Sequence, residues 1–246
     1  MKRQTTTLDF QKWEKWQRNL GRIKQELIRL YIAREMFKRL YSLFSNHKNL
    51  KKCPNKIFFT HLWNTFVVYL GMGIRRFSDE WSKANLCRLL EDMKKNIGQL
   101  CIDNYAEYLF KKCHEKRVEA NNTTNCEEKS MWGKLDRKYA HEMACRAFKD
   151  ALGKVAQVVT CDIIEDDIKN IKENAKPVKE IADKRWAHID VTKPTAPKFA
   201  DVDKCLDHLI EIYNKYSLLT TGDVFPQLDE QLFAGWDAPF RIPWTE

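Results

Sequence analysis

The amino-acid sequence predicts an all-α protein: one helical bundle over residues 1–246, with a long N-terminal helix and an irregular C-terminal tail. Only 8 glycines and 7 prolines occur in 246 residues, so turns are few and the elements between them are long. The chain contains no GxGxxG motif and no P-loop motif, which argues against Rossmann and P-loop enzymes. Hydrophobic residues make up 43% of the chain, enough to form a core, so wholesale disorder is not expected.

The first predicted helix covers residues 8–45, within a basic segment at 1–50. Its apolar residues recur at alternating steps of three and four, at positions 13, 16, 20, 23, 27, 30, 37, 41 and 44. This heptad-like seam predicts packing against the rest of the bundle or pairing with a second chain. Arg34 interrupts the seam, where it could face an acidic partner or extend its charged end to water.

A second helix is predicted from about residue 56 to 77. Its segment Ile57–Ile74 has 18 residues without a formal charge, at the threshold length for a membrane span. However, Thr60, His61 and Asn64 lie within it, and two arginines follow directly. A helix that is apolar nearly all round also suits the centre of a bundle. We therefore favour a buried central helix and expect no membrane association.

The remaining helices follow from apolar periodicity and from helix-terminating residues. Ser78 and Ser82 offer N-caps for a helix that ends near residue 96. Pro177 fits the first turn of another helix, ending near residue 189. The tail at 222–246 has three prolines and two tryptophans, and we expect it to lie across the bundle. The other predicted helices cover 99–119, 127–157, 161–174 and 199–219, and the predicted loops cover 46–55, 121–125 and 192–197.

The positive charge is concentrated at the N-terminal end. Residues 1–60 hold 15 Lys and Arg against 4 Asp and Glu, whereas the remaining 186 residues hold 28 against 30. Such a basic segment suits a polyanion such as nucleic acid, or an acidic partner surface. The simpler interpretation is the solvated face of one long helix.

The cysteines and the N-terminal sequence indicate a cytoplasmic protein. Eight cysteines are spread along the chain with no CxxC pair, which fits neither a zinc knuckle nor a compact disulfide framework. The first residues contain no apolar secretory segment. No histidine has a second histidine four residues later, so no metal site and no cofactor are expected.

His188 has the surroundings best suited to chemistry. On a helix, Lys184 and Arg185 lie four and three residues before it, which places both cations beside the imidazole. An imidazole can transfer a proton to or from a ribose hydroxyl or a leaving oxygen, while a guanidinium stabilises charge on a phosphate. The simpler alternative is a helix C-terminus, where Lys, Arg and His interact favourably with the helix dipole.

Arg76 and Asp79 form the second candidate site. They lie three residues apart at the end of the apolar helix, where they could contribute to substrate binding. A partly buried structural ion pair is the simpler interpretation.

Two stretches carry a resemblance to a known family: YLGMGIRRFSDEWSKANLCRLLEDM at residues 69–93 and IADKRWAHID at residues 181–190. Together with the proline-containing loop, the closing helix and the tail that ends in Pro243-Trp244, they resemble the HEPN superfamily, in the branch similar to the abortive-infection protein AbiU. The resemblance implies an α-helical bundle, usually dimeric, in prokaryotic phage-defence or toxin systems.

The catalytic members of that superfamily are metal-independent ribonucleases with an arginine, a short spacer and a histidine, brought together at a cleft between two subunits. His188 matches the histidine, with Arg185 as the phosphate-side charge, assisted by Lys184. Arg185 is closer to His188 than the family spacing, and residues 181–183, which have that spacing, include no cation. The resemblance implies RNA, a second copy of the chain and a cognate antitoxin as partners. The alternative is a non-catalytic helical module that binds a protein or nucleic acid.

Overall fold

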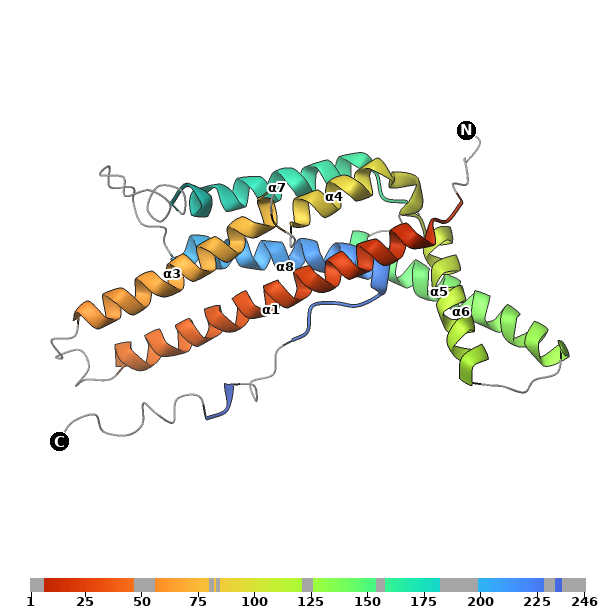
Figure 1. Ribbon diagram of the computed structural model, residues 1–246, viewed down its shortest axis with the longest axis horizontal. Coiled ribbons are helices and arrows are strands. Elements are labelled where there is room, and N and C mark those ends of the chain that lie inside the picture. The colour runs from red at the N-terminus through yellow and green to blue at the C-terminus, as the bar shows by residue number, and fades with distance from the viewer. Residues whose placement is uncertain are drawn as a thin grey trace.

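The computed structural model describes residues 7–46, 56–79, 82, 85–120, 126–153, 158–181, 199–227 and 233–235. These residues form an all-α bundle, which confirms the predicted fold class (Figure 1). Within them, the one contact of strand type is an isolated bridge between Cys101 and Val158. The helices are α1 (Phe10–Asn46), α3 (Lys56–Ser78), α4 (Leu86–Lys95), the 3-10 helix η1 (Ile97–Gln99), α5 (Ile102–Ala120), α6 (Cys126–Leu152), α7 (Cys161–Ile181) and α8 (Phe199–Thr221).

The apolar seam of α1 packs within the molecule. Trp13 lies at its N-terminal end with its ring stacked on those of Tyr105 and Tyr108, at centroid distances of 5.5 and 5.4 Å. Tyr41, near the other end, is exposed, so the seam is covered over most of its length. The buried seam residues are Trp13, Trp16, Leu20, Ile23, Leu27, Leu30 and Phe37.

Arg34 meets acidic side chains of the same chain. It is buried between α1 and α8, where its guanidinium pairs with Asp207 and with Asp203 at 3.2 Å. A buried guanidinium is tolerated only with such partners, because desolvation of an unpaired charge is costly. The polar interruption of the seam is therefore a charged contact between the first and last helices.

The central helix of the bundle is α8, not α3. α8 contacts α1, α3, α6 and α7, and its buried side chains lie on most sides of the helix. α3 instead exposes His61, Thr65, Tyr69 and Met72 along one face. The expectation that α3 is the buried central helix was wrong because its polar residues gather on this outer face. Within the described residues, no helix is long and apolar enough to cross a membrane.

Two predicted helix boundaries also differ. The N-cap of α4 is Asn85, whose Oδ1 accepts from the backbone N–H of Arg88 at 2.8 Å; Ser78 instead ends α3. Pro177 lies inside α7, which continues to Ile181. A proline there removes one backbone hydrogen bond, but burial of Ala175 and Val178 on either side holds the helix on the bundle.

The described parts of the tail, 222–227 and 233–235, pack on the bundle. The buried Phe225 ring lies 5.8 Å from that of Tyr31 and 6.3 Å from that of Tyr213. The backbone N–H of Phe225 donates to Asn214 Oδ1 at 2.6 Å. Further along, the guanidinium of Arg39 lies over the Phe233 ring at 4.6 Å. The tail thereby joins α1 to α8.

Candidate functional site

The predicted catalytic cluster of Lys184, Arg185 and His188 lies outside the described residues. The described chain ends on one side at Ile181, the last residue of α7, and resumes at Phe199, the first residue of α8. Phe199 packs against Phe37 of α1, with the ring centroids 4.8 Å apart. The N-terminal end of α8 therefore lies beside the C-terminal half of α1.

The second predicted pair, Arg76 and Asp79, does not form the expected contact. Asp79 pairs with Arg75, one turn earlier on α3, at 3.5 Å. Arg76 points to a different helix and pairs with Glu26 of α1 at 2.7 Å. The expected pair was wrong because Asp79 lies one helical turn after Arg75 and on the same face of α3. Arg76, the next residue, lies on the side of α3 that meets α1.

The positive charge of α1 lies on its solvent face. Lys15, Arg18, Arg22 and Arg29 are exposed and follow one another at steps of three, four and seven residues, so they form one line along the helix. We call these four residues the basic stripe. Lys15, Arg18 and Arg29 have acidic neighbours at its edges, Asp92, Glu14 and Glu26. Arg22 makes no ion pair within the described part of the chain.

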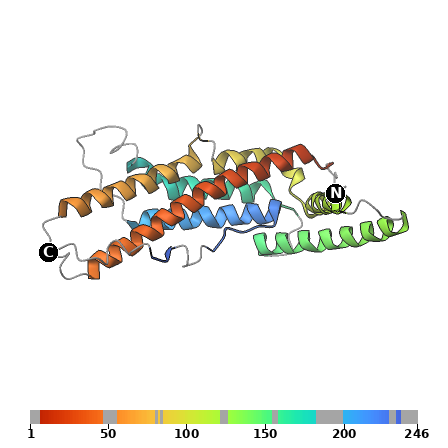
Figure 2. The same cartoon turned by 60° about the horizontal axis from the view of Figure 1, so that its bottom comes forward.

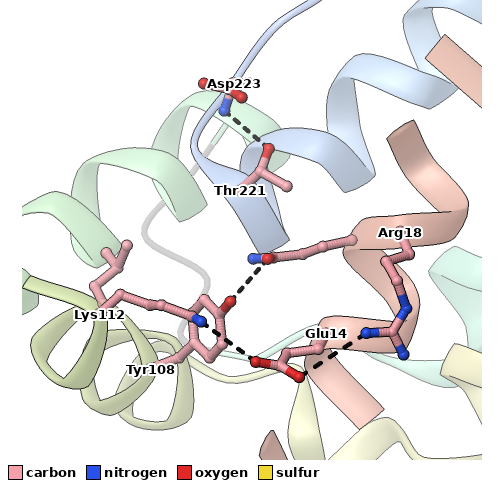
Figure 3. Close-up of a pocket in the computed structure, with 8 residues that line it drawn as sticks. Glu14, Arg18, Tyr108, Lys112, Thr221 and Asp223 are labelled. Carbon is pink, nitrogen blue, oxygen red and sulfur yellow. Dashed lines mark hydrogen bonds and ion pairs between the residues drawn. The ribbon is translucent and has the colours of Figure 1, made fainter. Parts of the chain in front are cut away.

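An open groove of about 540 Å³ lies beside one end of this stripe, between α1, α5 and the C-terminal end of α8 (Figure 3). Glu14 lies between the cations Arg18 and Lys112, with N–O distances of 3.9 and 3.3 Å. The groove is lined by Glu14, Gln17, Arg18, Tyr108, Leu109, Lys112, Thr221 and Asp223.

The polar groups of the groove are held by hydrogen bonds. The hydroxyl of Tyr108 donates to Gln17 Oε1 at 2.7 Å, and Gln17 Nε2 donates to the Thr220 carbonyl at 2.7 Å. Burial raises the pKa of Tyr108, so its phenol is neutral, and the hydrogen bond to Glu14 raises the pKa of Lys112, which keeps it charged. The groove thus presents fixed, paired charges, and Arg18 connects it to the basic stripe.

The cysteines and histidines of the described residues do not assemble a metal site. Within that part of the chain, no group of three or more His, Cys, Asp or Glu could hold a metal ion. Cys145 Sγ and His141 Nδ1 lie 3.6 Å apart on α6. Burial raises the pKa of Cys87 to about 11 and that of Cys205 to about 12, so both are neutral thiols near pH 7.

Sequence reasoning missed Glu26 and the groove. Glu26 lies four residues after Arg22 and three before Arg29, a spacing that places all three on one helix face and could have been noticed. Its contact with Arg76 depends on how α1 meets α3, and the sequence pattern does not specify this. The groove combines side chains from segments far apart in the chain, for which no local signal exists.

No protein-family model, no curated protein and no solved structure matches this chain.

Proposed function

We propose that this chain is an RNA-directed, HEPN-type protein of prokaryotic phage defence or toxin systems that binds RNA along the basic stripe of α1. The observation that carries the proposal is the stripe itself: four cations in one line are exposed, whereas the Glu26 carboxylate between Arg22 and Arg29 is only 15% exposed. From Lys15 to Arg29 the helix rises over 14 residue steps, about 21 Å at roughly 1.5 Å per residue, which is long enough to contact several phosphates. The resemblance in residues 69–93 and 181–190 and the all-α bundle agree with it.

In this proposal the reaction is metal-independent RNA cleavage at His188. The imidazole accepts the proton of a ribose 2′-hydroxyl as that oxygen attacks the adjacent phosphorus. The bond from phosphorus to the 5′-oxygen of the next nucleotide breaks, and that oxygen takes a proton from water. Arg185, assisted by Lys184, stabilises the charge on the phosphate oxygens. The protein acts in the cytoplasm as a homodimer, controlled by a cognate antitoxin.

Binding is tested with a fluorescently labelled single-stranded RNA at several salt concentrations. If the four cations of the stripe contact phosphates, log K falls with log salt with a slope of about −3, so binding weakens about 50-fold between 50 and 200 mM salt. The variant Lys15→Glu/Arg18→Glu/Arg22→Glu should lose most of this binding. The control Lys138→Glu/Arg146→Glu/Lys149→Glu, on exposed positions of α6, makes the same change in charge and should retain it. Equal loss in both variants would contradict a role for the stripe.

Cleavage is tested with the same RNA in the presence of a chelator. The wild-type protein should cleave it, and His188→Ala should not, because the proton acceptor is gone. Equal cleavage by the two proteins would exclude His188 as the catalytic group.

A second candidate function is binding without cleavage. The position of Arg185, closer to His188 than the family spacing, favours it. In that case RNA binding is salt-sensitive and survives His188→Ala, and neither protein cleaves.

A further inference from the structure

Two arginines from different helices meet on one carboxylate where α1 packs against α3. Arg29 NH1 lies 3.2 Å from Glu26 Oε2, and Arg76 NH1 lies 2.7 Å from Glu26 Oε1. The Glu26 side chain is 15% exposed, whereas those of Arg29 and Arg76 are 67% and 59% exposed. The carboxylate therefore lies beneath two guanidinium groups that are open to solvent.

Arg22 adds a third guanidinium to the same surface. It lies one helical turn before Glu26 on the exposed face of α1 and makes no ion pair with any residue that the structure describes. We call Arg22, Arg29 and Arg76 the arginine cluster. Two of these guanidinium groups contact Glu26, and the three arginines and one carboxylate together carry a net charge of +2. Each guanidinium has five N–H donors, and Glu26 engages one NH1 group of Arg29 and one of Arg76, so most of the donors remain free.

The backbone beneath the cluster is fixed by close packing. Leu27 and Leu30 of α1 and Ile74 and Phe77 of α3 are buried in the same core. Gly73 lies so close to α1 that a Cβ atom built on it would be 2.3 Å from Leu30 Cδ2. The helices that carry Arg29 and Arg76 therefore cannot separate without losing core contacts, so the two arginines stay close enough to bind one anion together.

We propose that the arginine cluster is a phosphate-binding site and that, if the proposed function holds, its ligand is a phosphate group of the bound RNA. Guanidinium groups match phosphate oxygens in geometry and can donate two parallel hydrogen bonds to them. The net charge of +2 is matched by a terminal phosphate monoester, which carries −1.5 to −2 near pH 7. Glu26 positions the arginines, and Arg76 extends the contact surface from α1 onto α3.

The test compares two RNA oligonucleotides of one sequence, with a 5′-phosphate or a 5′-hydroxyl, against Arg29→Ala and Arg76→Ala. Each variant should weaken binding about fivefold to tenfold and reduce the salt slope by about 1, as expected when one phosphate contact is lost. If the variants lose affinity only for the 5′-phosphorylated RNA, the site binds a terminal phosphate. Equal loss for both RNAs assigns it to a backbone phosphate. The control Arg146→Ala, exposed on α6, removes the same charge and should change neither value.

A second measurement separates this inference from the proposed function. Inorganic phosphate is titrated into the full-length protein while the NMR signals of the arginine Nε–H groups, assigned by these variants, are followed. Saturable shifts of Arg29 and Arg76 support the site even if RNA does not bind. If wild-type protein binds RNA but Arg29→Ala and Arg76→Ala bind it equally well, and phosphate shifts neither signal, the arginine cluster is not a phosphate site.

Discussion

The buried carboxylate of Asp167 is held by hydrogen bonds from two side chains of α8. Asp167 of α7 is buried and accepts from Lys215 Nζ with both oxygens, at 2.8 and 2.9 Å. It also accepts from the hydroxyl of Tyr216 at 2.8 Å. Burial raises the pKa of Tyr216, so this hydroxyl keeps its proton and remains a donor. Together the three side chains join α7 to α8.

Removing the carboxylate should therefore destabilise the fold. We expect Asp167→Ala to lower the free energy of unfolding by about 2–4 kcal/mol, because it leaves the Lys215 ammonium and the Tyr216 hydroxyl without their acceptor. Tyr216→Phe removes one hydrogen bond only and should cost about 1 kcal/mol. Urea denaturation followed by circular dichroism measures both values. If the two variants lost the same stability, the carboxylate would not be the central member of the network.

At the scale of the elements, the contact between α1 and α3 depends on one residue without a side chain. Gly73 is buried against Leu30, and the 2.3 Å separation available to a Cβ atom is shorter than any normal contact. Gly21, on the exposed side of α1, has no atom within 4 Å of such a position. The two glycines are thus a matched pair with opposite surroundings.

Alanine at the two positions should have opposite effects. We expect Gly73→Ala to destabilise the protein by about 1–3 kcal/mol, because Leu30 or the helices must move. Gly21→Ala should stabilise it by about 0.5–1 kcal/mol, because alanine favours a helix. Thermal unfolding of both variants checks this, and a neutral Gly73→Ala would mean that α1 and α3 can move apart. If Gly73→Ala moves α3 away from α1, it should also disturb the arginine cluster, whose members lie on both helices.

The elements also show how far the sequence could predict the fold. The seam of α1 and the helix at 199–219, now α8, were predicted because apolar residues at helical spacing must be covered in water. The exposed face of α3 was missed, because its uncharged composition concealed a polar side made by His61 and Thr65. Arg76 was selected as a candidate, but its partner Glu26 lies 50 residues away and is set by packing. Lys184, Arg185 and His188 remain predictions.

At the scale of the whole molecule, the tail segment 222–227 joins the first helix to the central one. The tail leaves α8 at Gly222, which adopts a positive φ of 74°, a conformation that favours glycine. It then places Phe225 between Tyr31 of α1 and Tyr213 of α8. Figure 2 shows this irregular segment passing beneath the bundle. In the same view, α6 extends beyond the end of the bundle where α1 begins.

Loss of the Phe225 ring should therefore weaken the whole bundle. We expect Phe225→Ala to lower the free energy of unfolding by about 2–4 kcal/mol, in the range found for buried phenylalanines. The exposed Val224→Ala is the control and should change it by less than about 0.5 kcal/mol. Chemical denaturation of both proteins measures the difference. Equal stability of the two variants would show that the tail contributes nothing to the bundle.

The side of α1 on which the apolar seam lies also restricts how two copies of this chain can associate. Since most of its apolar seam is covered by the chain's own helices, the exposed face of α1 between Lys15 and Arg29 is mainly cationic. Two such sides facing each other would bring eight positive charges together, and like-charge repulsion opposes that contact. In the proposed homodimer, this repulsion favours an interface outside the basic stripe, which leaves both stripes facing outward. One assembly would then present two separate tracks to RNA, and a strand long enough to reach both would bind more tightly than either track alone.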